Sequence, residues 1–203
     1  MLHGDGAWVS VIKNTVMRAH TIAEWLVEPE DRRLELIDGS FVEKAAPDVP
    51  HGFSQMGLIR ALSTPFHRPA GHGGAPGGWW IAPEIDIQLG NDGFRPDISG
   101  WRRDQLASLP RVRPVTQVPD WICEVLSESN RANDTVRKLR LYHRAGVGSY
   151  WLLDPTWGTL TVFRHEPQGF LNVLSAERHE VVNAPPFEVV EVRVAELLGD
   201  DPR

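Results

Sequence analysis

A carboxylate within an apolar run is the feature of this sequence that points most directly to chemistry. Glu124 is flanked by Ile122, Cys123, Val125 and Leu126, a pattern that predicts a buried strand. An ionised carboxylate that is buried without a partner costs several kcal/mol, so something must compensate it. The candidates are a raised pKa, an ion pair or a bound cation. A structural ion pair or an exposed strand end is the alternative to a functional site.

Two further charged residues, Asp97 and Lys138, are candidates for the same site because of their order along the chain. Asp97 follows Pro96 in a short predicted strand. Lys138 lies four residues after Asp134, on the helix that we predict beyond Glu124. Taken alone, an aspartate after proline is typical of a turn or cap, and the Asp134–Lys138 spacing is typical of a solvated helix face. Taken together, they place a carboxylate on each of two neighbouring strands and a lysine on the next helix.

This arrangement is suited to the hydrolysis of a phosphodiester. Carboxylates at the ends of adjacent strands, about 4.8 Å apart, can hold one hard divalent cation between them. Oxygen ligands suit Mg²⁺, with Mn²⁺ as a substitute. Such a metal polarises a phosphoryl oxygen and lowers the pKa of a bound water, while an ammonium nearby orients that water or stabilises developing charge. We therefore hypothesise that Asp97 and Glu124 bind Mg²⁺ and that Lys138 positions the water or the charge.

Other chemistries fit the sequence less well. The glycine-rich stretch 69–78 lacks the Lys and Ser or Thr of a Walker loop, and Pro76 stands where a dinucleotide fingerprint requires its third glycine. The single cysteine, Cys123, excludes a zinc site built on CxxC pairs. A Cys123 nucleophile with a histidine base is a different enzyme class. Strand alternation places Cys123 opposite Glu124, however, where we expect a small buried apolar side chain.

The elements that must position these residues are predicted from periodicity and from cap and turn residues. Thr21 and Glu24 form a capping box at the start of a short helix that Pro29 ends. Asp38-Gly39 predicts the turn of a β-hairpin. In chain order we expect a helix at 21–29, a hairpin at 33–43, a helix at 51–66, strands at 79–89, 94–101 and 121–127, a helix at 130–145 closed by Gly146, and four strands within 149–194 (SYWLLD, TLTVFRHE, FLNVLSAE and FEVVEVRV). This order predicts a mixed α/β fold.

The segment 79–89 is predicted as one strand with an acidic face. Its second half alternates strictly, so that three apolar side chains lie on one face and Glu84, Asp86 and Gln88 on the other. A turn at 91–93 leads into the strand at 94–101, and we expect these two strands to pair. On these grounds alone, Asp86 can equally be no more than a solvated neighbour of Glu84.

A series of seven blocks then extends along about residues 20–195: RLELIDGSFVE, APDVPHG, PEIDIQLG, RPDISGW, PDWICEVLSESN, NDTVRKLRLYHRAGV and SYWLLDP. In content and order, this series resembles the Uma2 family of restriction-type endonucleases, within the PD-(D/E)XK nuclease superfamily. The resemblance implies a restriction-endonuclease-like core, that is, an α/β (α+β) fold with a mixed central β-sheet flanked by helices. We assign this core to a single domain at 20–198, after an N-terminal extension at 1–19.

The resemblance also implies roles for individual residues. Asp97 matches the aspartate of the PD motif and Glu124 the acidic member of the ExK motif. Glu84 ranks as a third metal ligand only through the resemblance. The lysine of ExK is absent from the strand, because Leu126 stands two residues after Glu124. Lys138 matches the position on the following helix from which the family supplies it, and a long side chain can reach the same point from there.

The implied function is a Mg²⁺-dependent endodeoxyribonuclease with DNA as its partner. Restriction-type nucleases often act as homodimers, so we expect a homodimer from the resemblance. His51 and Gln55 match a recurring helix start in the family, and for both we expect packing or capping roles. Because fold alone does not establish activity, the alternative is a catalytically inactive nuclease-fold module that binds nucleic acid or protein.

The charge balance limits how such a protein meets nucleic acid. The 203 residues contain 21 Lys plus Arg against 27 Asp plus Glu, and the net charge of −6 argues against a broad basic coat. Residues 101–144 nevertheless hold nine Lys or Arg and five Asp or Glu, a local excess that suits a phosphate backbone or, equally, a solvated helix face. No apolar run reaches the roughly 18–20 residues that span a bilayer. With a single cysteine, this leads us to expect a cytoplasmic protein without a membrane partner.

Overall fold

The structure is a computed structural model that describes residues 18–201. Most of the predicted extension at 1–19 therefore lies outside the described residues. Within the described part of the chain, no helix has the length and apolar character needed to cross a membrane.

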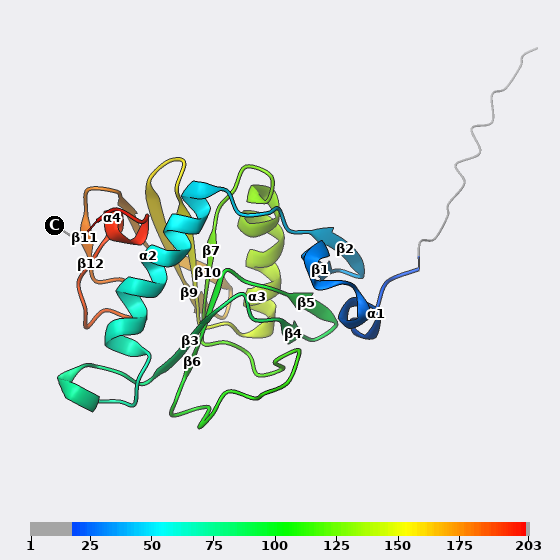
Figure 1. The fold of residues 1–203 in the computed structure, drawn as a ribbon, viewed down its shortest axis with the longest axis horizontal. Helices are drawn as coiled ribbons and strands as arrows, with labels where there is room; N and C mark the ends of the chain where they lie inside the picture. Colours follow the sequence, from blue (N-terminus) through cyan, green and yellow to red (C-terminus); the bar gives the residue numbers. More distant parts are fainter. Residues whose placement is uncertain (1–17, 202–203) are drawn as a thin grey trace, which may run out of the picture.

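Along the chain, helices separate groups of successive short strands (Figure 1). The helices are α1 (Ile22–Val27), α2 (Val49–Phe66), α3 (Leu139–Ala145) and α4 (Val194–Leu197), with shorter helical segments η1 (Glu30–Arg32), η2 (His72–Gly74) and η3 (Asn133–Lys138). The strands are β1 (Leu34–Ile37), β2 (Ser40–Glu43), β3 (Trp79–Pro83), β4 (Ile87–Leu89), β5 (Asp92–Phe94), β6 (Ile98–Arg102), β7 (Trp121–Val125), β8 (Ser149–Asp154), β9 (Thr159–Glu166), β10 (Gly169–Glu177), β11 (Val181–Val182) and β12 (Val192–Arg193).

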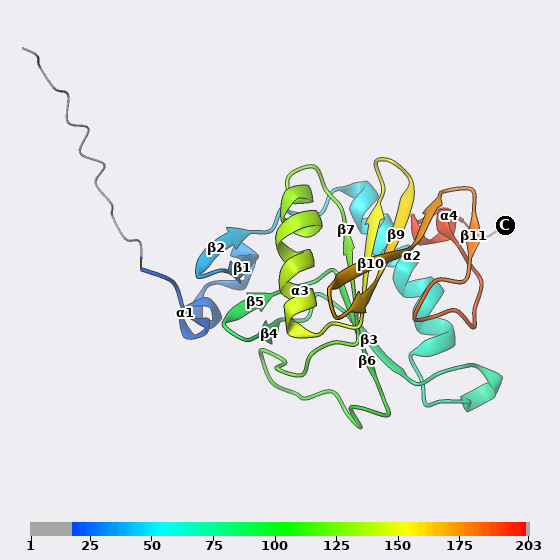
Figure 2. The ribbon, with the colours of Figure 1, turned by 180° about the vertical axis from the view of Figure 1, so that it is seen from behind.

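A six-stranded mixed sheet in the order β10-β9-β8-β7-β6-β3 forms the centre of the molecule. Its β7 and β8 run parallel, and the other neighbours are antiparallel. Helix α2 lies on one face and α3 on the other, as the two opposite views show (Figures 1 and 2). The predicted central sheet flanked by helices is therefore present.

Strand β7 divides its side chains between two cores. Trp121, Cys123 and Val125 belong to the core that includes the apolar side chains of α2. Ile122 belongs to the core on the opposite face, with side chains of α3. Because strand side chains alternate, Glu124 points to the α3 face. Cys123 is fully buried, and burial raises the pKa of its thiol well above the usual value, so it is the buried apolar-like side chain that its position predicts.

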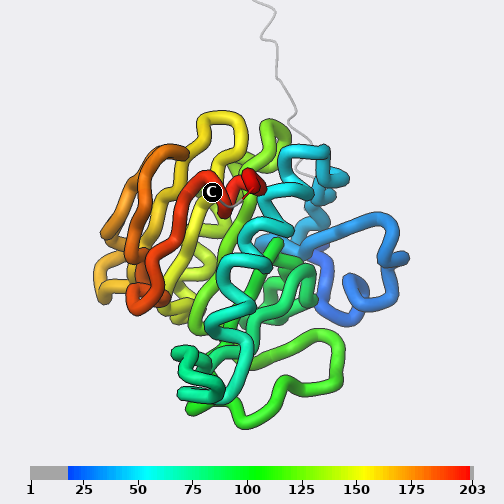
Figure 3. Tube along the Cα trace, turned by 60° about the vertical axis from the view of Figure 1, so that its left-hand side comes forward, coloured from blue at the N-terminus to red at the C-terminus, as the bar shows by residue number. Residues whose placement is uncertain are grey.

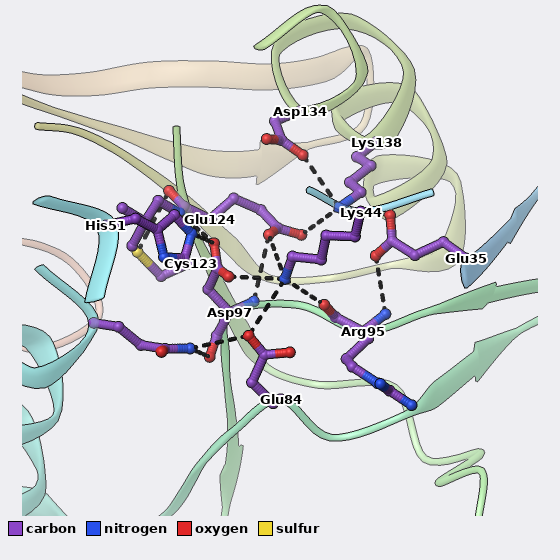
Figure 4. Close-up of polar contacts among 12 residues, drawn as sticks. Glu35, Lys44, His51, Glu84, Arg95, Asp97, Cys123, Glu124, Asp134 and Lys138 are labelled. Atoms are coloured by element: carbon purple, nitrogen blue, oxygen red, sulfur yellow. Dashed lines mark hydrogen bonds and ion pairs between the residues drawn. The ribbon is translucent and has the colours of Figure 1, made fainter. Parts of the chain in front are cut away.

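A second sheet, in the order β2-β1-β5-β4, stands beside the first. The predicted hairpin is confirmed, because β1 and β2 pair antiparallel across a turn at Asp38-Gly39. Both turn residues have positive φ, 49° and 72°, as the tight hairpin turn selected by this dipeptide requires. The hairpin ends at Glu43, so that the next residue, Lys44, enters the space between the two sheets (Figure 4).

The expected single strand at 79–89 is wrong. Strand β3 ends at Pro83, and Glu84 has a left-handed backbone with φ 52°, which a continuous strand cannot contain. After this break, β4 joins the second sheet and pairs with β5, whereas β3 pairs with β6 in the first. The alternation of apolar side chains continues across Glu84 because β3 and β4 each bury every second side chain. The two strands do so in different sheets.

The helix predicted at 130–145 is confirmed, with one difference in its geometry. Its first part, η3, is π-helical and continues directly into α3, and Gly146 ends the helix with φ 87°. A π-helical turn widens the helix locally and shifts which side chains face inward. Lys138, the last residue of η3, is thereby buried together with Asp134.

The last predicted strand, at 187–194, is mostly wrong. Only Val192–Arg193 pairs, with Val181–Val182, while Phe187 and Val190 close turns through their own backbone hydrogen bonds. Phe187 still packs against the aromatic side chains of the first sheet. The alternating apolar residues of this segment therefore belong to an irregular stretch that covers the sheet. From there the chain continues to α4, which lies against α2 (Figure 3).

Candidate active site

Asp97 and Glu124 lie side by side where β6 and β7 pair. The register pairs Ile98 with Cys123, and this brings the preceding Asp97 beside Glu124. The backbone N–H of Asp97 donates to Glu124 Oε2 at 3.3 Å, and the N–H of Val125 donates to Asp97 Oδ2 at 2.7 Å. Both carboxylates are buried. The two residues chosen from the sequence therefore share one site.

Lys138 reaches the same site from the helix, but it is enclosed by acids. Its Nζ lies 3.0 Å from Glu124 Oε1, 2.9 Å from Glu35 Oε2 and 3.1 Å from Asp134 Oδ1. The side chain is only 2% exposed. Asp134 and Lys138 form the ion pair that their spacing predicts. This pair is buried, whereas such spacing is typical of a solvated helix face. Tyr142 adds a hydroxyl that donates to Glu124 Oε1 at 2.8 Å.

Lys44 occupies the centre of the site and is not predicted by the sequence analysis. Its Nζ donates to Asp97 Oδ1 and to the backbone oxygen of Arg95, both at 2.7 Å (Figure 4). The same nitrogen lies 3.7 Å from Glu84 Oε1 and 3.9 Å from Glu124 Oε2. Nothing in its spacing marks this residue, because Lys44 follows a strand of the second sheet, while Asp97 directly precedes one strand of the first sheet and Glu124 lies within another.

Glu35 is a second residue that sequence reasoning missed, although a signal was present. It lies within β1 between Leu34 and Leu36 and is almost fully buried. One carboxylate oxygen accepts from the backbone N–H of Arg95 at 3.0 Å, and the other pairs with Lys138. A carboxylate in an apolar strand is the same criterion that selects Glu124, and applied consistently it finds Glu35.

Glu84 stands at the rim of the site, with its side chain 28% exposed. Its Oε1 accepts from Gln55 Nε2 at 3.2 Å and from Arg33 Nη2 at 3.3 Å. Its backbone N–H also donates to the carbonyl oxygen of Asp97 at 3.2 Å. The left-handed turn at Glu84 therefore holds this residue beside the start of β6.

The first turns of α2 also contribute to the site. His51 Nε2 lies 3.2 Å from Asp97 Oδ2, and Gln55 Nε2 donates to the carbonyl oxygen of Asp97 at 3.1 Å as well as to Glu84. The expected packing or capping roles of these two residues are therefore wrong. The cap of the helix is Asp48, whose side chain accepts from the N–H of His51.

Asp86 lies next to the site without joining it. Its carboxylate is buried and pairs with Arg95, at 2.6 Å, and with Arg113. The structure therefore excludes the alternative that Asp86 is only a solvated neighbour of Glu84. Glu84 and these arginines, together with Arg33, line a cleft of about 360 Å³. Glu84 is the residue that the cleft shares with the site, whereas Asp97, Glu124 and Lys138 are buried and do not line it.

The site holds more carboxyl groups than lysines, and this imbalance shifts the pKa values of both kinds of group. Burial alone raises the pKa of Asp97, but Lys44 and His51 outweigh it and hold this pKa well below its usual range. Burial raises the pKa of Glu124 to about 8, because Lys138 and Lys44 offset it only in part. For both lysines the neighbouring carboxylates outweigh burial and raise the pKa, so both ammonium groups are charged.

The donors around Lys44 have the chemistry of a hard-cation site. Oxygens of Asp97, Glu84 and Glu124 and the carbonyl of Arg95 surround the Lys44 ammonium at 2.7–3.9 Å, and oxygens of these types are the ligands that Mg²⁺ prefers. With Lys44 in this position, the carboxylates surround an ammonium. No three His, Cys, Asp or Glu side chains among residues 18–201 are arranged to hold a metal ion. The oxygen donors are of the types that suit Mg²⁺, but the Lys44 ammonium stands among them, where the metal would bind.

Comparisons with known proteins agree with this fold. The Uma2 family model, described as "Putative restriction endonuclease", matches residues 20–195. A crystal structure of "a putative nuclease belonging to DUF820" from Anabaena variabilis ATCC 29413 is similar, with a TM-score of 0.68 and 21% sequence identity over 88% of this chain and 97% of that chain. At this identity the likeness concerns the fold. No curated protein matches the chain significantly.

Proposed function

Because the chain belongs to the Uma2 family, we propose that it is a metal-dependent endonuclease that hydrolyses DNA phosphodiester bonds at the Asp97–Glu124 site. The observation that carries this proposal is that the Asp97 and Glu124 carboxylates lie side by side, buried, at the paired ends of two strands. A surplus of buried carboxylates costs folding free energy, and a divalent cation is the partner that would balance it.

In this proposal, Asp97 and Glu124 hold Mg²⁺ or Mn²⁺, and Glu84 assists from the rim. The bound metal supplies Lewis-acid polarisation of a phosphoryl oxygen and a bound water of lowered pKa. His51 and Gln55 hold the Asp97 side chain and carbonyl in place. The cleft beside Glu84 would admit the phosphate backbone, and its arginines would contact the phosphates on exchanging their present carboxylate partners.

Lys138 has a different role from the one that its motif position suggests. Its ammonium already has three carboxylate partners and is only 2% exposed. We assign it as a positioning residue that acts through Glu124, together with Tyr142 on the same oxygen. It orients Glu124 toward Asp97 and balances the buried charge without touching the phosphodiester.

The experiment that tests this function is cleavage of supercoiled plasmid by the native protein with Mg²⁺, with Mn²⁺ and with EDTA, alongside a single-stranded RNA. Metal-dependent conversion of the plasmid to nicked or linear DNA is the expected result. Cleavage that persists in EDTA would contradict the metal requirement. No cleavage of either substrate, at protein concentrations well above that of the substrate, would overturn the enzymatic proposal.

One observation favours a second candidate function. Lys44 fills the cation position with a permanent positive charge, as expected of a nuclease fold that no longer turns over. Such a module would bind nucleic acid or protein without cleaving it. Binding of a DNA duplex that is unaffected by EDTA, in a protein that cleaves nothing, would support this alternative.

We also propose that the protein is a homodimer, because two copies of a restriction-type site are needed to meet both strands of a duplex. Multi-angle light scattering on the purified protein should give twice the mass of one chain. A monomer across the micromolar range would contradict this expectation and would favour nicking of one strand.

A further inference from the structure

We propose that Lys44 is a built-in cation of the carboxylate site, which holds the site together without metal and must leave for a divalent ion to bind. This inference rests on the proposed metal-dependent function. It assigns the lysine after the β-hairpin as the residue that sets metal affinity.

The geometry excludes simultaneous occupation by both cations. Lys44 Nζ lies 2.7 Å from Asp97 Oδ1 and 2.7 Å from the carbonyl oxygen of Arg95, in the middle of the oxygens that would ligate the metal. Mg²⁺ binds oxygen at about 2.0–2.1 Å and demands near-octahedral geometry. A divalent ion on Asp97 and Glu124 would therefore take the place of the ammonium and repel it.

Lys44, unlike Lys138, lies next to the rim of the site. It is the first residue after β2, followed by an irregular segment at 44–48 that leads to α2. Glu84 Oε1 lies 3.7 Å from the Lys44 ammonium, and the Glu84 side chain is 28% exposed and borders the cleft, so a displaced ammonium would move toward this rim. Lys138 contrasts with it, because it projects from a helix into three carboxylates and makes no contact with the rim.

The first test is an Mn²⁺ titration by isothermal calorimetry of the native protein, Lys44→Met and Lys44→Arg. Methionine keeps the length and apolar character of the stem and removes the charge, whereas arginine keeps a cation as the matched control. We expect Lys44→Met to bind Mn²⁺ at least tenfold more tightly than the native protein, and Lys44→Arg to bind no more tightly than the native protein. Equal or weaker binding by Lys44→Met would overturn the role of Lys44.

The same titration separates this inference from the function on which it rests. If the native protein and Lys44→Met bind Mn²⁺ with the same affinity, the result supports metal binding at the site and contradicts the role of Lys44. If neither protein binds Mn²⁺, the metal dependence itself falls, and the role of Lys44 with it.

A second test uses the native protein, in case Lys44→Met fails to fold. The chain contains three lysines, Lys13, Lys44 and Lys138, so acetylation by a soluble acetyl ester can be followed at each by mass spectrometry. Without metal, Lys44 and Lys138 are both buried and should react slowly. Mg²⁺ should raise the rate at Lys44 at least fivefold and leave Lys138 unchanged. A Lys44 rate that does not respond to millimolar Mg²⁺ would contradict the displacement.

Discussion

Both oxygens of Glu124 have partners inside the protein, and this makes the residue a structural as well as a chemical centre. Oε1 receives Lys138 and the Tyr142 hydroxyl, and Oε2 receives the backbone N–H of Asp97. A buried ion pair contributes little net stability when intact, but loss of one partner leaves an uncompensated charge. Residues of this site therefore affect folding and chemistry together, and variants must be chosen to separate the two.

Removal of the Lys138 ammonium should be costly. Lys138→Met leaves Glu35, Glu124 and Asp134 without their common partner, so we expect the free energy of unfolding to fall by about 3–5 kcal/mol. Urea denaturation followed by circular dichroism measures this change. Arg137→Met, one residue away and exposed, is the control and should change stability by less than about 0.5 kcal/mol. Equal effects of the two substitutions would show that the buried ammonium contributes no net stability.

The pKa of Glu124 predicts how stability depends on pH in the presence of a chelator. With this pKa near about 8, the folded protein keeps a proton that the unfolded chain releases above a pH of about 4.3. Stability from this proton is complete below the unfolded pKa and is lost as the pH rises through the folded pKa. Between pH about 5 and about 8, the native free energy of unfolding should therefore fall relative to that of Glu124→Gln, by up to about 1.4 kcal/mol per pH unit. Parallel pH profiles of the two proteins would show that Glu124 is ionised throughout.

At the scale of elements, two local irregularities position the site. The left-handed turn at Glu84 moves the chain from one sheet to the other, and the π-helical turn at the start of the long helix turns Lys138 inward. Periodicity predicted both neighbouring elements but neither irregularity. A break in a strand is invisible when both halves alternate, and helical spacing of apolar residues does not distinguish a π turn from an α turn. The elements themselves were predictable, because their cap and turn residues are local signals.

Helix α2 carries His51 and Gln55, and its position depends on close contact with α4. A Cβ added at Gly57 would lie 2.3 Å from the carbonyl oxygen of Glu196, a backbone atom that cannot easily move away. Gly57→Ala should therefore destabilise the protein by about 1–3 kcal/mol in thermal or urea denaturation. Gly52, in the same helix, has open space around its Cβ position, so Gly52→Ala should be neutral or stabilising by up to about 1 kcal/mol. A stable Gly57→Ala protein would show that α4 can shift away from α2.

At the scale of the whole molecule, the site exists only where two sheets and two helices meet. Asp97, Glu124 and Lys138 could be selected from the sequence because two strands and a helix that follow one another bring them together. Lys44 could not, since its partners come from the other sheet and no local pattern marks it. The excess of basic residues at 101–144 is only partly available at the surface, because Lys138 is buried and Arg113 is paired with Asp86 and Glu30. Charge counted along the chain therefore overstates what the surface offers to DNA.

The most direct test of the central claim compares plasmid cleavage rates of the native protein, Asp97→Asn and Glu124→Gln in Mg²⁺, with Asp104→Asn as control. Asp104 is an exposed carboxylate whose ion-pair partner among residues 18–201 is Arg102. If Asp97 and Glu124 are the reaction centre, each isosteric substitution should lower the cleavage rate by about 100-fold or more, while Asp104→Asn stays within about twofold of native. Cleavage at the native rate by folded Asp97→Asn and Glu124→Gln proteins would contradict the assignment and place the reaction elsewhere in the molecule.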